Sequence, residues 1–490
     1  MNVKLDTLEE ISKSQFENET VLSDLIVRVT DLLKSDSTFR RYLPKRCGVP
    51  VMILLKILCV MRVCSDSVMM AQRHLNYSLY SEHISKNGFY RFLGDSLFNW
   101  RMVLIRMALK FQAYLRARKM EDSKDVPRCY IVDDTTIRKT GVTMERVSKV
   151  HDHTDNSYQL GYKLLACAFF DGRSTMVADF SLLRESKKNK FGLSKTELAR
   201  QHTKVRDENS PAYKRLQEAD ADKITLVTEM ISRLWKNGIV GDYLLVDSWF
   251  PCDRLITCIR SIGKGSVHVI GRLKMGGKKY DVDGRKLNLN EMASLYESKA
   301  QYCKKYKCKY ISHKAKMDGE DVKIFIVIVG RKKKTEAFMT TDMSLSFAKC
   351  FELYQIRWNI EVLFKECKQY LDLGGSQSTD FDAQIADATL CFLTHMALTM
   401  EKRLTDYETI GEMFYELRES LFERTLWMRN LKLFESIMAD LADMFGLNMS
   451  EMMNGTNELT NPENKSKLIK ITRVLLANLT ETEIKSVLNR

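Results

Sequence analysis

The sequence is poor in proline and has neither a low-complexity tract nor a long uninterrupted hydrophobic run. Six prolines in 490 residues, with 44% hydrophobic and 29% charged residues, argue against long disordered linkers and indicate two to four folded units. The most apolar stretch, Val51–Cys64, is interrupted by Lys56 and Arg62. It is shorter than the roughly 20 residues of a membrane span, so it predicts a buried helix. The polar N-terminus does not resemble a cleavable signal peptide.

Cysteine usage limits the cellular compartments that suit the protein, and net charge limits its possible partners. Twelve cysteines are scattered along the chain, which indicates reduced thiols and a cytoplasmic protein. The net charge is +14, from 77 basic and 63 acidic residues. This excess favours a polyanionic partner, with nucleic acid ahead of an anionic membrane surface. Ordinary basic proteins carry a similar excess, so charge alone does not choose between these classes.

The two ends of the chain are predicted to be helical. In residues 1–122, apolar side chains recur at helical spacing through Leu22–Leu33, Val51–Met70 and Leu97–Leu115. This region is either a domain that binds DNA ends or a plain helical bundle. Residues 401–490 form a second helical region, with dimerisation or DNA contact as its expected role.

The middle of the chain predicts a mixed sheet. Apolar strand patterns begin at Arg128, and two strands flank the turn Asp171–Arg173 before helices and strands alternate. The order β-β-β-α-β-α-β is that of a ribonuclease H-like sheet. We therefore predict a multi-domain α/β protein whose ribonuclease H-like core comprises residues 123–274 and 343–400. A β-rich insertion, 275–342, separates the two parts of this core.

Two predicted strands end in aspartate. Asp133 and Asp134 follow the apolar run Tyr130–Val132, and Asp247 follows Leu244–Val246. These strands are neighbours in the predicted sheet. Because side chains alternate between faces, only one of Asp133 and Asp134 can point with Asp247 toward a shared site. An isolated aspartate at a strand end more often begins a turn or caps a helix, but a third carboxylate favours a site.

The third carboxylate lies in the segment Tyr354–Gly374, which predicts one helix with two polar faces. At about 100° per residue, one polar stripe about 80° wide contains Tyr354, Arg357, Glu361, Lys365 and Lys368. The second polar face, interpreted as the solvated one, contains Gln355, Asn359 and Glu366. A run of i,i+4 salt bridges explains the charges of the stripe but not its tyrosine, and a simple surface helix has only one polar face.

Three carboxylates flanked by arginine and lysine suit two-metal phosphoryl transfer. Carboxylate oxygens are the ligands that Mg²⁺ prefers, and two metal ions about 4 Å apart stabilise the attacking and leaving oxygens. Arginine and lysine on the same face would hold the flanking phosphates.

The same residues carry a resemblance to a known family. Tyr354, Arg357, Glu361 and Lys368 match Y-x2-R-x3-E-x6-K at every position. The match resembles the Y-R-E-K signature of a group of bacterial insertion-sequence DDE transposases. Two further motifs resemble the first and second aspartate motifs of that group: DDT at Asp133–Thr135 and DSWF at Asp247–Phe250. The resemblance spans roughly residues 125–400 and includes the β-rich insertion.

The resemblance implies the roles of individual residues. It assigns Asp134, Asp247 and Glu361 as catalytic residues and as ligands of two Mg²⁺ ions, for which Mn²⁺ is a substitute. Asp134 is chosen over Asp133 because in related members the first catalytic aspartate directly precedes Thr-Thr. The contacts to DNA are expected from Tyr354, Arg357 and Lys368, and from Lys365 on the same stripe.

The implied function is that of a magnesium-dependent DNA transposase in the bacterial cytoplasm, beside the nucleoid. It would nick double-stranded DNA at inverted-repeat ends and join the freed 3′-hydroxyl to target DNA, as a homodimer. A structure-specific nuclease on the same core is the alternative within enzymes. A catalytically inactive, domesticated DNA-binding protein is the alternative of another class.

Several other features have an open or a weak interpretation. Trp249 and Trp358 either stack on a displaced base or belong to the core. The basic segments Ser186–Arg215 and Arg331–Lys334 either contact the DNA backbone or carry solvated charge. His151–His153 is interpreted as a polar turn. A remaining set fits no common zinc spacing: Cys303, Cys308 and His313.

Overall fold

The computed structural model describes residues 36–64, 84–120, 126–152, 155–185, 192–317, 319–329, 334–405 and 407–419. The predicted helix Leu22–Leu33 and the C-terminal region from residue 420 onward lie outside the described residues. The second predicted helix appears as α4 (Val51–Cys64), and the part of its predicted range from residue 65 to Met70 is also outside them.

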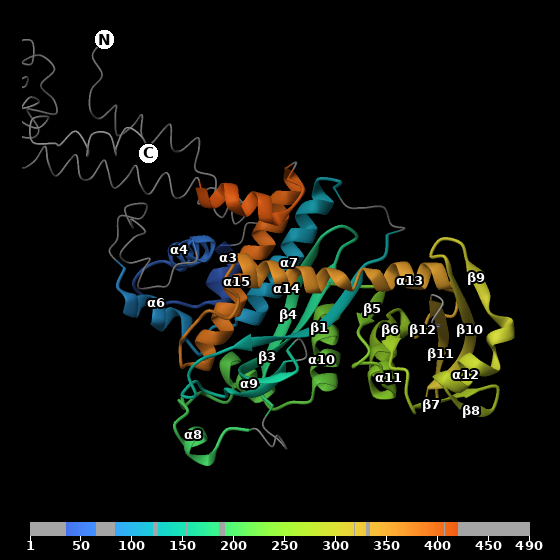
Figure 1. Ribbon diagram of the computed structural model, residues 1–490. Helices are drawn as coiled ribbons and strands as arrows, with labels where there is room; N and C mark the ends of the chain where they lie inside the picture. Colours follow the sequence, from blue (N-terminus) through green and yellow to red (C-terminus); the bar gives the residue numbers. More distant parts are fainter. Residues whose placement is uncertain are drawn as a thin grey trace, which may run out of the picture. The chain divides into compact units, whose positions relative to one another are not determined.

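Twelve strands of the described chain form one mixed sheet (Figure 1). Five of them form its core in the order β4-β3-β1-β5-β6. Their bounds are β1 (Cys129–Arg138), β3 (Ser157–Phe170), β4 (Thr175–Leu183), β5 (Tyr243–Val246) and β6 (His268–Leu273). The pairs β1–β3 and β3–β4 are antiparallel, whereas β5 and β6 continue parallel to β1. This order confirms the predicted mixed α/β fold with a ribonuclease H-like core.

Two details of the first strands differ from the prediction. β1 does not end at the aspartates but continues through them to Arg138, because β3 pairs with it over its full length. A strand that the sequence reading missed, β2 (Ser148–Asp152), pairs with the first residues of β3. His151 and Asp152 therefore lie on a strand, so their interpretation as a polar turn is wrong; His153 lies outside the described residues.

The β-rich insertion extends the core sheet. β12 (Lys334–Thr340) pairs antiparallel with β6, and β11 and β10 follow it outward. The remaining elements of this region are β7 (Lys279–Val282), β8 (Arg285–Asn288), α12 (Leu289–Leu295), η3 (Glu297–Lys299), β9 (Gln301–Cys303), β10 (Cys308–Met317) and β11 (Glu320–Val329). The insertion thus continues the edge that β6 would otherwise leave unpaired.

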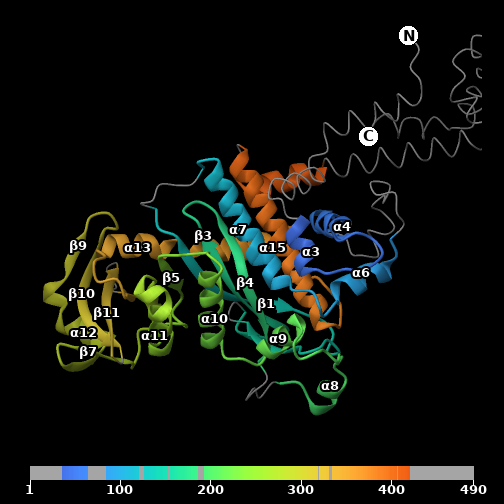
Figure 2. The same ribbon diagram turned by 180° about the vertical axis from the view of Figure 1, so that it is seen from behind.

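Helices cover both faces of the core sheet. α14 (Trp358–Tyr370) packs on β1, and α10 (Lys223–Lys236) packs on β3 and β4. Figure 2, seen from behind, shows α10 on the side of the sheet away from α14. α10 starts at the N-cap Asp222, whose side chain accepts a hydrogen bond from Thr225 N, and buries its apolar stripe. The other helices between the core strands are α8 (Lys195–Ala199), α9 (Pro211–Glu218), α11 (Asp253–Ser261) and η2 (Ile262–Gly265).

The N-terminal helices pack against the end of the catalytic region. They are α3 (Asp36–Tyr42), α4, α6 (Lys86–Leu93) and α7 (Trp100–Ala117). α7 and α4 both contact α15 (Phe381–Leu404), and Arg62 of α4 pairs with Asp387 of α15. A further helical segment covers residues 410–419. Within the described residues, no helix combines the length and apolarity needed to cross a membrane.

The segment predicted as one helix is in fact two. α13 (Phe347–Gln355) and α14 follow one another across the sheet (Figure 1). Between them the backbone tightens, since Arg357 N donates to Tyr354 O and Ile360 N donates to Arg357 O, each three residues back. In such a turn side chains three residues apart lie one above the other, so Tyr354 stays on the side of Arg357, whose guanidinium lies 5.7 Å from the ring centre of Tyr354.

Candidate active site

Register places two aspartates side by side. β1 and β5 are parallel, and Val132 is the partner of Val246 at the last pair of their ladder. Asp133 and Asp247 are the next residue of each chain. Facing positions of neighbouring strands point to the same side of a sheet, so Asp133 shares the face of Asp247 and Asp134 takes the opposite one.

α14 brings the third carboxylate over this face. Arg357 Nη1 donates a 2.9 Å hydrogen bond to Asp133 Oδ2, and Arg357 Nη2 donates to Glu361. Two residues along β1, Thr135 Oγ1 accepts a 2.6 Å hydrogen bond from Lys368 Nζ. The face of Asp133 and Thr135 therefore lies beneath α14, with Glu361 attached to Asp133 through one guanidinium.

Asp134 is held on the other side of β1. Its Oδ2 accepts a hydrogen bond from Lys223, and its Oδ1 lies 3.6 Å from Lys163 Nζ. Lys163 is buried and also donates to Thr136 Oγ1 at 3.2 Å. Asp134 thus has two cationic partners, Lys223 and Lys163.

A cleft of about 860 Å³ opens at this end of the sheet. The three predicted acids and Asp133 all line it, together with four lysines: Lys223, Lys274, Lys365 and Lys368. Lys365 and Lys368 were predicted from the helix, whereas Lys223 and Lys274 were missed. A usable signal existed, because Lys274 directly follows β6, and the carboxyl ends of parallel strands meet at one edge of a sheet.

The electrostatics of the cleft follow from burial and crowding. Burial is the main cause that raises the pKa of Asp133 to about 7, and the carboxylates of Asp247 and Asp134 raise it further against the lowering effect of Arg357. Burial also lowers the pKa of Lys368. The protein therefore holds a partly uncompensated carboxylate where an added cation would be most favourable.

The donor set suits a divalent metal. Asp133, Asp247 and Glu361 offer carboxylate oxygens, which are hard ligands for Mg²⁺. Across the described part of the chain, no three ligating side chains already stand within reach of one ion. Arg357 donates a hydrogen bond to one oxygen of Asp133 and to one oxygen of Glu361. A bound cation would compete with Arg357 for these carboxylates.

The predicted aromatic residues occupy different places. The half-buried Tyr354 packs edge-on against Phe338 of β12 at 4.9 Å between ring centroids, and the Arg357 guanidinium lies 5.7 Å from its ring centre. Trp249 and Trp358 are 47% and 60% exposed, so their interpretation as core residues is wrong. Trp249 lines the cleft, and Lys223 Nζ lies 4.6 Å from its ring centroid.

The second polar face of α14 is only partly solvated. Glu366 Oε2 lies 2.8 Å from Nε2 of His395, a buried residue of α15. Asn359 and Glu366 also line a separate cleft of about 680 Å³. The prediction of an ordinary solvated face is therefore wrong for Glu366, which joins α14 to α15.

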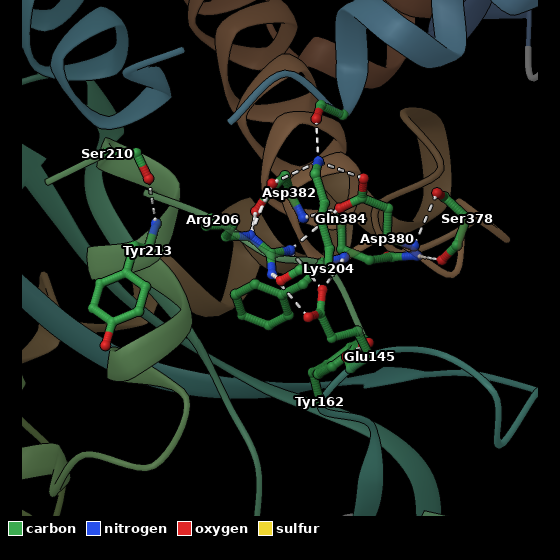
Figure 3. A network of polar contacts seen from close by, with 12 residues as sticks. Glu145, Tyr162, Lys204, Arg206, Ser210, Tyr213, Ser378, Asp380, Asp382 and Gln384 are labelled. Atoms are coloured by element: carbon green, nitrogen blue, oxygen red, sulfur yellow. Dashed lines mark hydrogen bonds and ion pairs between the residues drawn. The ribbon is translucent and has the colours of Figure 1, made fainter. Parts of the chain in front are cut away.

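Basic side chains of the loop after β4 form ion pairs within the protein. Arg206 is buried and donates to both Glu145 and Asp382, and Lys204 donates to Asp382 (Figure 3). Arg215 is also buried. The DNA-backbone interpretation is wrong for these three cations, because their side chains are paired or enclosed. Residues 186–191 and 330–333 of the predicted basic segments lie outside the described residues.

The cysteines and the histidine of the insertion have packing partners. Cys303 of β9 pairs in register with Cys308 of β10, and both are buried. The His313 ring stacks on Tyr296 with 3.8 Å between centroids.

Comparison with known families assigns the class of protein. Residues 124–397, more than half of the chain, match the family model described as the transposase DDE domain. The chain belongs to this DDE transposase family. No curated protein matches the chain. Within the family, the Y-R-E-K group and an origin in a bacterial insertion sequence stay predictions.

Proposed function

We propose that the protein is a metal-dependent transposase of a bacterial insertion sequence, of the Y-R-E-K group. It would cleave DNA at inverted-repeat ends and join these ends to target DNA. The observation that carries this proposal is the common face of Asp133, Asp247 and Glu361 in a cleft lined by four lysines. A transposase family match supports the same conclusion.

The carboxylates are the proposed metal ligands. Two Mg²⁺ ions, with Mn²⁺ as a substitute, would supply Lewis-acid activation of water and of the 3′-hydroxyl in an in-line displacement. Asp133, Asp247 and Glu361 would hold these ions. Arg357 orients Asp133 and Glu361 in the protein alone, and its planar guanidinium matches a flanking phosphate of the DNA.

The choice between the neighbouring aspartates is part of the proposal. The resemblance selects Asp134, whereas the register with β5 favours Asp133. We propose Asp133 as the ligand and Asp134 as a positioning residue, because Lys223 and Lys163 already neutralise Asp134 on the opposite face.

The DNA is proposed to follow the lysines of the cleft. Lys274, Lys365 and Lys368 would bind phosphates as point charges, whereas Lys223 pairs with Asp134. The exposed ring of Trp249 lies among them and offers a flat apolar surface to a base. Two ends must be processed together, so a homodimer on double-stranded DNA in the cytoplasm, beside the nucleoid, is the proposed active species.

The test is a cleavage and strand-transfer assay on DNA that carries the terminal repeats of the gene's own locus. With Mg²⁺, the full chain should nick these ends and join them to a target duplex. Asp133→Asn, Asp247→Asn and Glu361→Gln should each lower the rate by more than about a hundredfold, and Asp134→Asn by about 10- to 100-fold. Activity of Glu361→Gln equal to that of the unchanged protein would overturn the site.

Two further outcomes of the same assay discriminate between functions and residues. Cutting of branched DNA without joining would identify a structure-specific nuclease instead. Loss of activity in Asp134→Asn with activity retained in Asp133→Asn would return the ligand role to Asp134. Light scattering of the protein with and without the DNA ends would test the dimer.

A further inference from the structure

A second cavity lies between four helices of the described chain, away from the cleft. It measures about 200 Å³ and shares no lining residue with the cleft. Trp100 and Arg101 of α7, Arg215 of α9, Arg233 of α10 and Asp382 of α15 line it. It therefore lies where the N-terminal helices meet the catalytic core.

Three guanidiniums of this cavity share two carboxylates. Three guanidiniums, Arg101, Arg215 and Arg233, meet two carboxylates, Asp179 and Glu218. Arg101 Nε and Arg233 Nε each donate 2.8 Å hydrogen bonds to Asp179, one to each oxygen. Arg101 donates to both oxygens of Glu218, at 2.7 and 2.6 Å. The oxygens of these two carboxylates are thus occupied, and these five side chains carry one positive charge in excess. The adjoining cluster, in which Lys204 and Arg206 pair with Glu145, Asp380 and Asp382, carries one negative charge in excess.

Several buried donors have no acceptor among the described residues. They are Trp100 Nε1, Arg215 Nε, Arg215 Nη2 and Arg233 Nη2. Trp100 is 3% exposed and Arg215 is 6% exposed, so bulk water does not reach these two side chains freely. All four atoms are donors, so the missing partner is an acceptor. A buried donor without an acceptor costs about 1 to 3 kcal/mol.

The nearby acidic residues do not supply this acceptor. Asp382 lines the cavity, but Arg206 and Lys204 already donate to its two oxygens (Figure 3). Asp95, also in the lining, accepts a 2.9 Å hydrogen bond from Leu97 N with its Oδ1. The exposed Lys214 also lines the cavity.

Three helices begin at the cavity. The first residues of α7 and α9 line it, as does Asp382 at the start of α15. Helix N-termini carry partial positive charge and favour anions. Burial, with the repulsion from Arg101, lowers the pKa of Arg215 to about 9, which agrees with a charge that the protein alone does not compensate.

We propose that this cavity binds one oxyanion of phosphate or sulfate size, held by Arg215, Arg233 and Trp100. A water molecule takes up about 30 Å³ in the liquid, so the cavity has room for a tetrahedral anion with some water. Water would satisfy the donors, whereas the anion would also give Arg215 a negative partner of its own. The bound ion would join α7 to α9 and α10. The ion is either free inorganic phosphate or a phosphodiester of bound DNA.

The experiment is isothermal titration calorimetry of the full chain with inorganic phosphate, at constant ionic strength. The unchanged protein should bind one phosphate ion in this cavity. Arg215→Met removes a charged hydrogen-bonding partner and should weaken this binding at least about tenfold. Lys365→Ala is the matched control, because it removes a cation of the cleft and should leave this ion in place.

A milder variant keeps the test decisive if Arg215→Met does not fold. Trp100→Phe retains the ring and removes one donor, so it should weaken phosphate binding by a factor of about 2 to 12. Unchanged phosphate affinity in both variants, or in Trp100→Phe alone when Arg215→Met does not fold, would overturn the proposal. So would the absence of any bound phosphate in the unchanged protein.

A competition arm identifies the source of the ion. Duplex DNA that lowers phosphate binding in the unchanged protein, at a DNA concentration that saturates the cleft, would identify a backbone phosphate as the occupant. Unchanged phosphate affinity in the presence of DNA would identify a free ion. Because the cavity is separate from the cleft, these results do not depend on the transposition assay.

Discussion

Arg357 Nη1 donates a 2.9 Å hydrogen bond to Asp133 Oδ2 while the same guanidinium is bonded to Glu361 one turn along α14. This contact joins the helix that carries one carboxylate to the strand that carries another. It also explains why Asp133 is oriented toward the cleft although burial disfavours its charge. The predictions below test this arrangement and the structure that supports it.

The raised pKa of Asp133 predicts a pH-dependent stability of the metal-free protein. Its pKa rises from 3.8 to about 7, first because of burial. The folded state therefore binds this proton more tightly than the unfolded state, and stability should fall as the pH rises from about 4 to about 7. Asp133→Asn removes this loss and should raise the free energy of unfolding near pH 8 by up to roughly 4 kcal/mol.

Thermal unfolding in the presence of a chelator, at about pH 5 and about pH 8, measures this effect. The difference between Asp133→Asn and the unchanged protein should be small at the lower pH and larger at the higher one. An equal difference at both pH values would contradict the assignment of the raised pKa to Asp133.

Gly161→Ala should destabilise the fold. Gly161 lies on β3 between β1 and β2, and a Cβ there would come within 2.0 Å of the carbonyl oxygen of Ile137. Since backbone must move to make room, we expect a loss of about 1 to 3 kcal/mol or more. Chemical denaturation provides the measurement. Gly277→Ala is the control, because its Cβ would meet nothing within 4 Å and should leave the midpoint unchanged.

Arg206→Met should unfold the protein more readily without changing DNA affinity. The buried guanidinium is the shared partner of Glu145 and Asp382 (Figure 3). Its removal leaves two buried carboxylates without this partner and should cost about 3 to 5 kcal/mol. Urea denaturation measures the loss, and DNA binding is measured at a temperature where the variant is folded. A drop in DNA affinity equal to that of Lys365→Ala would show that Arg206 contacts DNA after all.

Tyr354→Phe and Tyr354→Ala should differ. The ring packs against Phe338 of the insertion, so phenylalanine keeps this contact and alanine removes it. A fully buried ring would lose about 3 to 5 kcal/mol of stability on replacement by alanine, and the half-buried Tyr354 should lose less. We also expect Tyr354→Ala to misplace Arg357. Tyr354→Phe should remain as stable as the unchanged protein. If Tyr354→Phe is fully stable but fails to cleave DNA ends, the hydroxyl itself contacts the substrate.

Lys274→Ala should weaken DNA binding in a salt-dependent way. The side chain lines the cleft at the end of β6. Removing one phosphate contact should reduce the slope of log affinity against log salt by about 0.9 for double-stranded DNA. Fluorescence anisotropy at several salt concentrations measures this slope. Lys195→Ala, on α8 and outside the cleft lining, is the control and should leave the slope unchanged.

Part of this site could be predicted from the sequence. The apolar runs Tyr130–Val132 and Leu244–Val246 require buried strands, and the acids after them cannot enter a core unpaired. The spacing of Arg357, Glu361 and Lys368 identifies a helix face, because helical geometry is local. These local rules led to the mixed α/β fold. The DDE transposase family came from the resemblance of the motifs, and the family match confirms it.

What only the tertiary structure decided depends on pairing between distant segments. The register of β1 with β5 puts Asp133, not Asp134, on the face of Asp247, and a shift of one residue would have reversed this. The cleft gained Lys223 and Lys274 from separate elements, and Arg206 was enclosed by acids that lie far from it in sequence. The sequence by itself determined which chemical groups the protein carries and which of them share a helix or strand face, since composition and periodicity are local properties of the chain. The tertiary structure decided which of them meet, since hydrogen-bond register and burial arise only when distant segments pack together.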